Sequence, residues 1–161
     1  MLILEHDIPF KFLTGMEFIK LTVKLNNTEV IEKNIQEIGK AIALENELNH
    51  YINSYSNRMK YKLLIICALI IQPYLLLLDE PFTELDPVTN YKLVDLFKST
   101  KINTILFSTH TADIAYNYGT TLLYLQKNGV CENKISDFKS ANELNSYITK
   151  KMKDDLSKED R

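Results

Sequence analysis

Two adjacent carboxylates, Asp79 and Glu80, directly follow four leucines at positions 75–78. Four leucines without polar alternation predict a strand that is buried on both faces of a parallel sheet. Ligands of such sheets bind at the carboxyl ends of the strands, where both carboxylates would lie. There Asp79 can bind the Mg²⁺ of a nucleoside triphosphate, usually through water, and Glu80 can accept a proton from an attacking water. The alternative is an ordinary strand that ends in an acidic loop.

A second candidate site lies at the start of a helix predicted at residues 57–71. Ser56 is a typical N-cap, and the apolar end of the helix stops before Gln72 and Pro73. Such a helix start presents unpaired backbone N–H groups and the positive end of the helix dipole, which suit a phosphate. An ordinary capped helix has the same features, so this segment alone does not identify a phosphate site.

Two further candidates follow along the chain. Asp86 precedes Pro87 at the start of a helix predicted at 87–98, so a purely structural N-cap role is available to it. His110 follows a strand predicted at 102–108, where the alternative is a loop histidine with an ordinary hydrogen-bond partner. Neither residue alone indicates a functional site, so the assignment depends on all the candidates occurring together.

In this order the segments resemble the ATP-binding cassette (ABC) family, the nucleotide-hydrolysing subunits of ABC transporters. Residues 55–63 are similar to its signature motif, in the variant that begins Tyr-Ser and continues Met-Lys. Residues 75–80 resemble Walker B, residues 83–86 the D-loop and His110 the switch histidine. The strand and Asn-Gly turn expected at 122–130 are also similar to those that follow the switch histidine in this family.

The resemblance implies a role for each candidate. Asp79 would bind Mg²⁺, Glu80 would activate water, and His110 would bridge Glu80 and the γ-phosphate of ATP. The residues that would contact the nucleotide, several of them in the site of a second subunit, are Ser56, Asn57, Arg58, Met59, Asp86 and Glu5.

Two of these positions depart from the family pattern. Arg58 stands where the signature variant has glycine; it could place its guanidinium on phosphate oxygens or be a solvated surface residue. Glu5 stands where the family usually has the Q-loop glutamine, which senses the γ-phosphate and contacts the membrane partner. A glutamate can accept a hydrogen bond from a metal-bound water but cannot donate one. Its place is counted from Thr14, which forms a capping box with Glu17 at the start of the helical subdomain.

The sequence contains no Gly-x-x-x-x-Gly-Lys-Ser/Thr phosphate loop; its nearest approach, Gly39-Lys40, is followed by Ala41. Family members carry this loop before the Q-loop. We therefore expect the chain to start at about that point, to form the second half of a cassette and to be inactive in isolation. We also expect its leucine-rich strand edges to associate.

The expected fold is α/β: a partial P-loop NTPase (ABC ATPase) fold with a mostly parallel sheet flanked by helices and an α-helical subdomain. Residues 1–152 would form the partial domain, with the helical subdomain and signature helix at about 12–72 and the Walker B, D-loop and switch-histidine core at about 73–133. The charged tail at 153–161 is expected to be disordered. The other predicted elements are a strand at 2–4, helices at 14–25, 28–51 (with a possible break near Gly39), 111–117 and 144–152, and a hairpin of strands 121–126 and 130–133 joined by Asn128-Gly129.

Composition is compatible with this assignment. The chain has 161 residues, 45% of them hydrophobic, and a formal net charge of −2, so no global field attracts nucleic acid. Cys67 and Cys131 have no metal-binding spacing and indicate a reducing compartment. The apolar stretch 63–78 is shorter than the roughly 20 residues of a membrane span and is interrupted by Gln72-Pro73.

The resemblance implies an ATP-binding and ATP-hydrolysing subunit, with ATP and Mg²⁺ as cofactors, that drives solute transport. Its partners would be a transmembrane permease subunit and a second ATPase subunit in a head-to-tail dimer, with no nucleic acid. Its location would be cytoplasmic, peripheral on the inner face of the cell membrane. One alternative is a degenerate, non-catalytic cassette fragment or interaction module. Another is the lobe of a DNA-repair or chromosome-type ATPase, although no sustained heptads are present.

Overall fold

The computed structural model describes residues 1–3, 8–29, 31–83, 85–126 and 129–156. The chain divides into two compact units, Met1–Ser108 and Thr109–Arg161, each of which is described by itself. The boundary differs from the predicted division near residue 72, which falls inside the first unit. The predicted domain boundaries remain a prediction.

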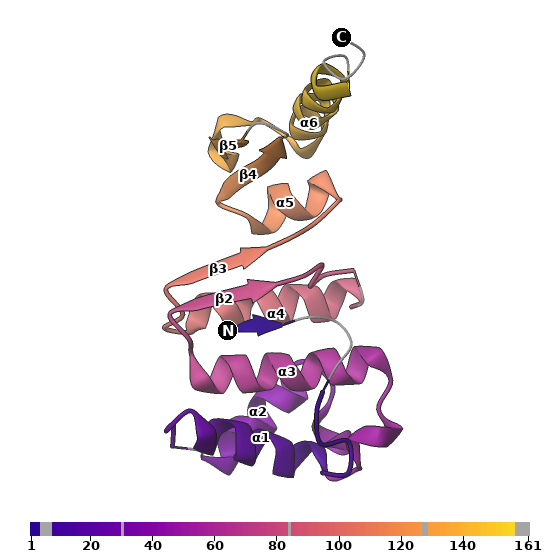
Figure 1. The fold of residues 1–161 in the computed structure, drawn as a ribbon, viewed down its shortest axis with the longest axis vertical. Helices are drawn as coiled ribbons and strands as arrows, with labels where there is room; N and C mark the ends of the chain where they lie inside the picture. Colours follow the sequence, from indigo (N-terminus) through magenta and orange to yellow (C-terminus); the bar gives the residue numbers. More distant parts are fainter. Residues whose placement is uncertain (4–7, 30, 84, 127–128, 157–161) are drawn as a thin grey trace. The chain divides into compact units, whose positions relative to one another are not determined.

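The first unit is built around a parallel sheet of three strands (Figure 1). The central strand β2 (Leu75–Leu78) pairs with β1 (Leu2–Ile3) on one side and with β3 (Thr104–Phe107) on the other. The prediction of a mostly parallel sheet is therefore confirmed, with a strand β3 shorter than the 102–108 expected.

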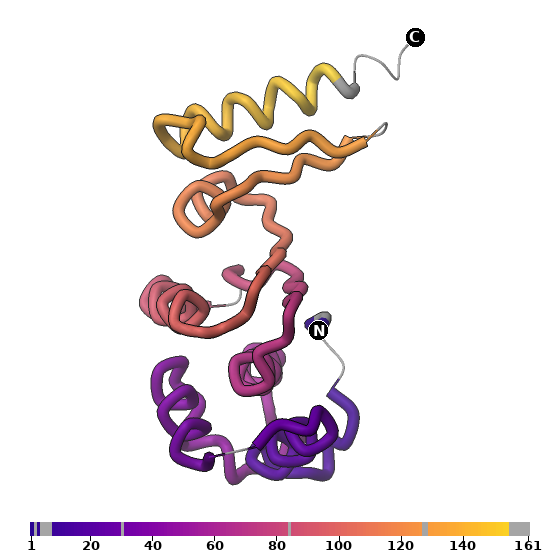
Figure 2. Tube along the Cα trace, turned by 90° about the vertical axis from the view of Figure 1, so that its left-hand side faces the viewer, coloured from indigo at the N-terminus to yellow at the C-terminus, as the bar shows by residue number. Residues whose placement is uncertain are grey.

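The two faces of this sheet differ. Leu76 and Leu78 are buried, whereas Leu75 is 40% exposed and Leu106, on the same face of the neighbouring strand, is 45% exposed. The prediction that β2 is buried on both faces is thus wrong. Helix α4 (Pro87–Ser99) lies on one side of β2 and β3 in both views and covers only that face (Figures 1 and 2).

Helix α3 (Asn57–Ile71) is the core of the first unit and has the predicted bounds. Eight of its 15 residues are buried, as expected for a helix that packs on several sides. Cys67 is among them, and burial raises the pKa of its thiol to about 12, so this cysteine stays protonated and unreactive. The thiol is therefore structural.

Helix α1 (Gly15–Leu25) also begins as predicted, with a capping box between Thr14 and Glu17. The helix predicted over 28–51 is not continuous, and the break considered near Gly39 is confirmed: α2 (Glu32–Ala41) ends two residues after that glycine. It is followed by two 3₁₀ turns, η1 (Glu45–Glu47) and η2 (Ile52–Ser54).

Core packing explains this break in the helix. Ile42 and Leu44 are both almost fully buried, yet they would point to opposite sides of a continuous helix. The chain buries both by turning at Ala43, whose φ of 53° is left-handed.

The second unit comprises α5 (Ala112–Tyr118), the antiparallel hairpin β4 (Thr121–Gln126) and β5 (Gly129–Lys134), the turn η3 (Ile135–Asp137) and α6 (Ala141–Leu156). Its small core contains Ala115, Ile135 and Leu144. The hairpin was predicted, although Asn128 of its turn lies outside the described residues.

Helix α6 is longer than the 144–152 expected. Ser140 accepts a hydrogen bond from the Glu143 amide and so starts the helix earlier. Residues 153–156, assigned to a disordered tail from the sequence, are helical, and residues 157–161 lie outside the described part.

None of the helices described here has the length and apolar character that crossing a bilayer would require.

Candidate functional site

Ser108, which follows β3, is hydrogen-bonded to the end of β2, where Asp79 and Glu80 follow the strand. Its hydroxyl donates a hydrogen bond to Asp79 Oδ1 at 2.6 Å and accepts one from the Glu80 amide at 2.9 Å. Its own amide donates to the Leu78 carbonyl at 3.0 Å, which continues the pairing of β2 and β3. Both carboxylates therefore lie at the carboxyl edge of the sheet, as the sequence predicts, and both are tied to the neighbouring strand.

Glu80 has an unusual backbone conformation, with a φ of 44°. A non-glycine residue in this left-handed region is strained and needs support from its surroundings. Support comes from Ser108 at its amide and from Thr83, whose hydroxyl donates to Glu80 Oε2 at 3.0 Å. The conformation and direction of Glu80 are thus supported by one hydrogen bond to the neighbouring strand segment and one within its own turn.

The segment after Glu80 is held against α4. Phe82 is buried and meets the ring of Phe107 edge to face at a centroid distance of 5.2 Å. The side-chain amide of Asn90 donates to the Phe82 carbonyl at 3.0 Å from inside the core. These contacts hold Phe82, the residue that precedes the segment resembling the D-loop.

Asp86 is the N-cap of α4. Its Oδ1 accepts hydrogen bonds from the amides of Val88 and Thr89, at 3.1 and 3.0 Å, and its Oδ2 accepts one from the Thr89 hydroxyl at 2.6 Å. These bonds, that of the Thr89 hydroxyl foremost, lower the pKa of the Asp86 carboxyl. The structural role of Asp86 is therefore present, whatever further role it has.

At the start of α3, Ser56 caps the helix by accepting a hydrogen bond from the Met59 amide at 3.2 Å. Ser56, Asn57 and Arg58 are exposed, and Met59 is half-buried. Within the described residues, the side chain of Arg58 makes no hydrogen bond or ion pair, which favours the solvated alternative. The helix end is open to a partner.

The residue before Ser56 is anchored instead. Tyr55 is 4% exposed, and its hydroxyl donates to the Glu47 carbonyl at 2.6 Å. Burial raises the pKa of this hydroxyl to about 12. The ring lies against Gly15, where any Cβ would overlap the hydroxyl oxygen. A glycine at the first position of α1 thus makes room for the tyrosine that leads into the signature segment.

The structure brings some predicted residues together and leaves others apart. Helix α3 runs opposite to β2, so its amino end and the carboxyl end of β2 lie at the same end of the first unit (Figure 1). His110 belongs to the second unit, so the proposed bridge from His110 to Glu80 remains a prediction. Glu5 lies outside the described residues.

The donor set at β2 can be compared with what Mg²⁺ requires. Among the described residues, no three His, Cys, Asp or Glu side chains gather into a metal site. Asp79, with one oxygen bonded to Ser108, offers a single carboxylate. Mg²⁺ usually binds through one or two carboxylates, several waters and substrate phosphates, so Asp79 fits a nucleotide-bound Mg²⁺ and not an all-protein cage.

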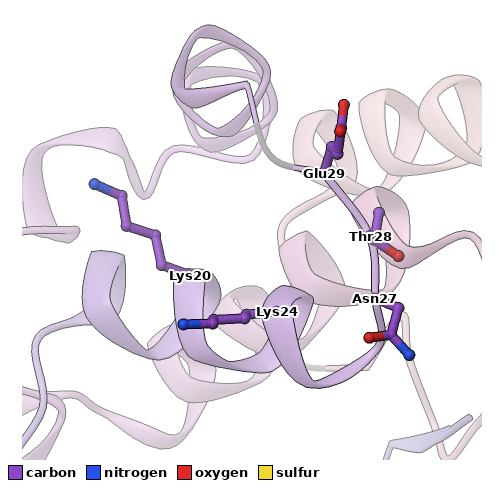
Figure 3. A pocket seen from close by; sticks show the side chains of 5 residues that line it. All are labelled: Lys20, Lys24, Asn27, Thr28 and Glu29. Atoms are coloured by element: carbon purple, nitrogen blue, oxygen red, sulfur yellow. The ribbon is translucent and has the colours of Figure 1, made fainter.

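A hollow of about 410 Å³ lies elsewhere, beside α1 (Figure 3). Its lining consists of Lys20, Lys24, Asn27, Thr28 and Glu29, from α1 and the segment that follows it. Lys20 is already paired with Glu32. None of the predicted site residues lines this hollow.

Sequence reasoning missed the supporting roles of three residues: Ser108, which it assigned to no motif, and Thr83 and Tyr55, which it named only as parts of the D-loop and signature segments. The signal for Ser108 was its place as the last residue of the strand predicted at 102–108, since a strand end is where ligands of a parallel sheet bind. Thr83 lies three residues after Glu80, a spacing at which a turn brings side chains together. No local pattern indicated the contact between Tyr55 and Gly15.

Comparison with known proteins begins with sequence. No family model matches the chain. The ABC-type transporter ATP-binding protein EcsA of Bacillus subtilis is 30% identical over 130 residues, which are 78% of this chain and 53% of that protein. The phosphate import ATP-binding protein PstB of Pyrococcus furiosus is 31% identical over 119 residues, 68% of this chain and 47% of that protein. The chain spans about half the length of these two relatives.

Solved structures give the same result for the fold. The ATP-binding subunit of an ABC transporter has a TM-score of 0.78 at 24% identity, covering 92% of this chain and 67% of that one. A dimeric, post-hydrolysis ATP-binding cassette bound to ADP and Pi has a TM-score of 0.68 at 26% identity, covering 83% of this chain and 62% of that one. The predicted partial α/β fold of a P-loop NTPase is therefore confirmed, and the chain belongs to the ATP-binding cassette family.

Proposed function

We propose that this chain supplies the Walker B and signature portions of an ATP-hydrolysing ABC transporter subunit. The observation that carries the proposal is the placement of Asp79 and Glu80. Both follow the central strand of a parallel sheet at its carboxyl end, and both are held by hydroxyl groups, from Ser108 and Thr83. This is where parallel sheets bind ligands, and two carboxylates there suit phosphoryl transfer.

The two carboxylates divide the chemistry between them. Asp79 would hold Mg²⁺, which when bound neutralises charge on the nucleotide phosphates. Glu80 accepts the proton or hydrogen bond of the attacking water. Because the Thr83 hydroxyl donates to Oε2 of Glu80, the carboxylate is oriented before water arrives. His110 is assigned to the γ-phosphate and to Glu80.

The signature segment serves a second site. Ser56, which already accepts the Met59 amide, can donate its hydroxyl hydrogen to a phosphate oxygen. The amides of Asn57, Arg58 and Met59 and the positive end of the α3 dipole favour the same anion. The similarity to a dimeric cassette supports a head-to-tail pair in which this helix end meets nucleotide held by the other subunit.

A phosphate loop must come from outside these 161 residues, because the sequence contains none. The exposure of Leu75 and Leu106 on one sheet face supports further polypeptide packing there. The chain by itself is accordingly assigned no ATPase activity. A permease partner and a place on the inner face of the cell membrane belong to the same proposal, supported by relatives named as transporter subunits.

The test compares this chain alone with the same chain joined to the phosphate-loop region of EcsA. We expect Mg²⁺-dependent ATP hydrolysis from the joined protein and none above background from the chain alone. Hydrolysis by the chain alone would contradict the need for an added phosphate loop. ATP binding without hydrolysis in the joined protein would instead favour a non-catalytic cassette module.

That non-catalytic module is the second candidate function. It is favoured by Arg58, an exposed and bulky side chain where the signature variant has glycine, since a Cβ hinders close approach to phosphate. Replacing Arg58 with glycine in the joined protein distinguishes the two candidates. The catalytic candidate predicts hydrolysis with arginine already present, whereas the non-catalytic one predicts hydrolysis only in the glycine variant.

A further inference from the structure

Ser108 has a position that no other described residue shares. It directly follows β3, and its hydroxyl lies between the side chain of Asp79 and the backbone of Glu80, 29 and 28 residues away in the sequence. A hydroxyl has one hydrogen to give and lone pairs to accept with. Since the Glu80 amide can only donate, Ser108 accepts from Glu80 and gives its single hydrogen to Asp79.

The direction of these bonds has consequences for both carboxylates. Asp79 Oδ1 is occupied by a short bond to a hydroxyl, so the rotation of the carboxylate is restrained and Oδ2 is left to face a ligand. Glu80 lies beyond Leu78, the last residue of β2, and its amide donates a hydrogen bond to the Ser108 hydroxyl. That bond helps to hold the left-handed backbone from which the Glu80 side chain projects.

We propose that Ser108 is a positioning residue that sets the orientation of the metal-binding Asp79 and of the base Glu80 through one hydroxyl group. The proposal rests on the function assigned above to these carboxylates. Ser108 itself contacts no reacting atom. Through Ser108, the distance between β2 and β3 determines how Asp79 and Glu80 are oriented at the end of β2.

A graded set of variants separates this hydrogen-bonding role from simple packing. Ser108→Thr keeps the hydroxyl, Ser108→Cys keeps the volume with a weaker donor and acceptor, and Ser108→Ala removes both bonds. The matched control is Ser99→Ala, because Ser99 is exposed and bonds only within its own helix, to the Leu96 carbonyl.

The first measurement is amide hydrogen exchange at Glu80 in the full chain. We expect Ser108→Ala to speed this exchange by about tenfold, Ser108→Cys by less, and Ser108→Thr and Ser99→Ala to leave it within about twofold. Equal exchange in the serine, cysteine and alanine proteins would overturn the proposal.

The second measurement is ATP hydrolysis by the chain joined to a phosphate loop. We expect kcat to fall by about tenfold in Ser108→Ala with KM for ATP nearly unchanged, and threonine to restore it. Full rescue by cysteine would point to packing and overturn the proposal. If the unsubstituted joined protein did not hydrolyse ATP, the proposed function would fail, while the exchange experiment would still decide the role of Ser108.

Discussion

At the carboxyl end of β2, the side chains assigned to chemistry are themselves hydrogen-bonded, to Ser108 and Thr83. At the amino end of α3, Ser56 to Arg58 are exposed, and the buried support lies one residue behind them, in Tyr55. A base needs a fixed direction before the reaction begins, whereas a surface that meets another subunit needs access. The carboxyl end of β2 is therefore rigid and the amino end of α3 is open, and each property can be tested separately.

The largest effect is expected at the rigid end. Glu80→Gln keeps the shape and the bond from Thr83 but removes the base, so ATP hydrolysis by the joined protein should fall by about 10²–10⁴-fold. Steady-state hydrolysis and nucleotide binding are measured together, and binding should persist. Glu37→Gln, on the exposed face of α2, is the control and should change neither. Retained hydrolysis in Glu80→Gln would contradict the assignment of Glu80 as the base.

The support behind the open end is tested by Gly15→Ala. The added Cβ overlaps the Tyr55 hydroxyl and lies 3.2 Å from the Leu48 carbonyl oxygen, so we expect a loss of about 1–3 kcal/mol in the free energy of unfolding. Urea denaturation measures the loss. In a Tyr55→Phe background the same substitution should cost less, because the hydroxyl is gone.

Gly39→Ala is the matched control for Gly15→Ala. Its Cβ would first meet Leu48 Cδ1, a movable side-chain atom at 3.3 Å, so it should be close to neutral. Equal costs for Gly15→Ala with and without the tyrosine hydroxyl would show that Tyr55 does not depend on this glycine.

The openness of α3 is tested by Ser56→Asp. Aspartate is as good an N-cap as serine and favours the helix dipole, so the Tm should not fall. Its charge would repel the γ-phosphate, however, and hydrolysis by the joined protein should drop by about tenfold or more. Ser56→Thr keeps both the cap and the hydroxyl and should retain activity. An active Ser56→Asp protein would mean that this helix end meets no phosphate.

The same contrast explains what the sequence could predict. Local signals were sufficient for Ser56, Asp86 and the capping box at Thr14, because each bonds within three residues of itself. The bonds of Ser108 span 28 and 29 residues and depend on the register of β2 with β3, which no local pattern encodes. The exposed face of β2 was missed for a related reason, since a run of leucines records apolar character but not how much of it the rest of the chain covers.

Asp86, the N-cap of α4, gives the smallest expected effect. Its hydrogen bonds lower the folded-state pKa below the unfolded value near 3.8, so the stability it contributes is fully present above 3.8 and is lost as pH falls through the folded pKa. Asp86→Ala should therefore lower the Tm by a few degrees at pH 7, and the difference from the unsubstituted chain should shrink below pH 3.8. Asp95→Ala, at an exposed position of the same helix, is the control and should show no such narrowing.

Asp86→Ser then decides to which region Asp86 belongs. Serine caps the helix without a charge, so the Tm at pH 7 should stay near that of the unsubstituted chain. If hydrolysis by the joined protein also stays unchanged, Asp86 is a structural cap like Thr14. If hydrolysis falls while the Tm is unchanged, the Asp86 carboxylate acts at the nucleotide site. The hydrogen-bonded region that contains Asp79 and Glu80 then also includes the start of α4.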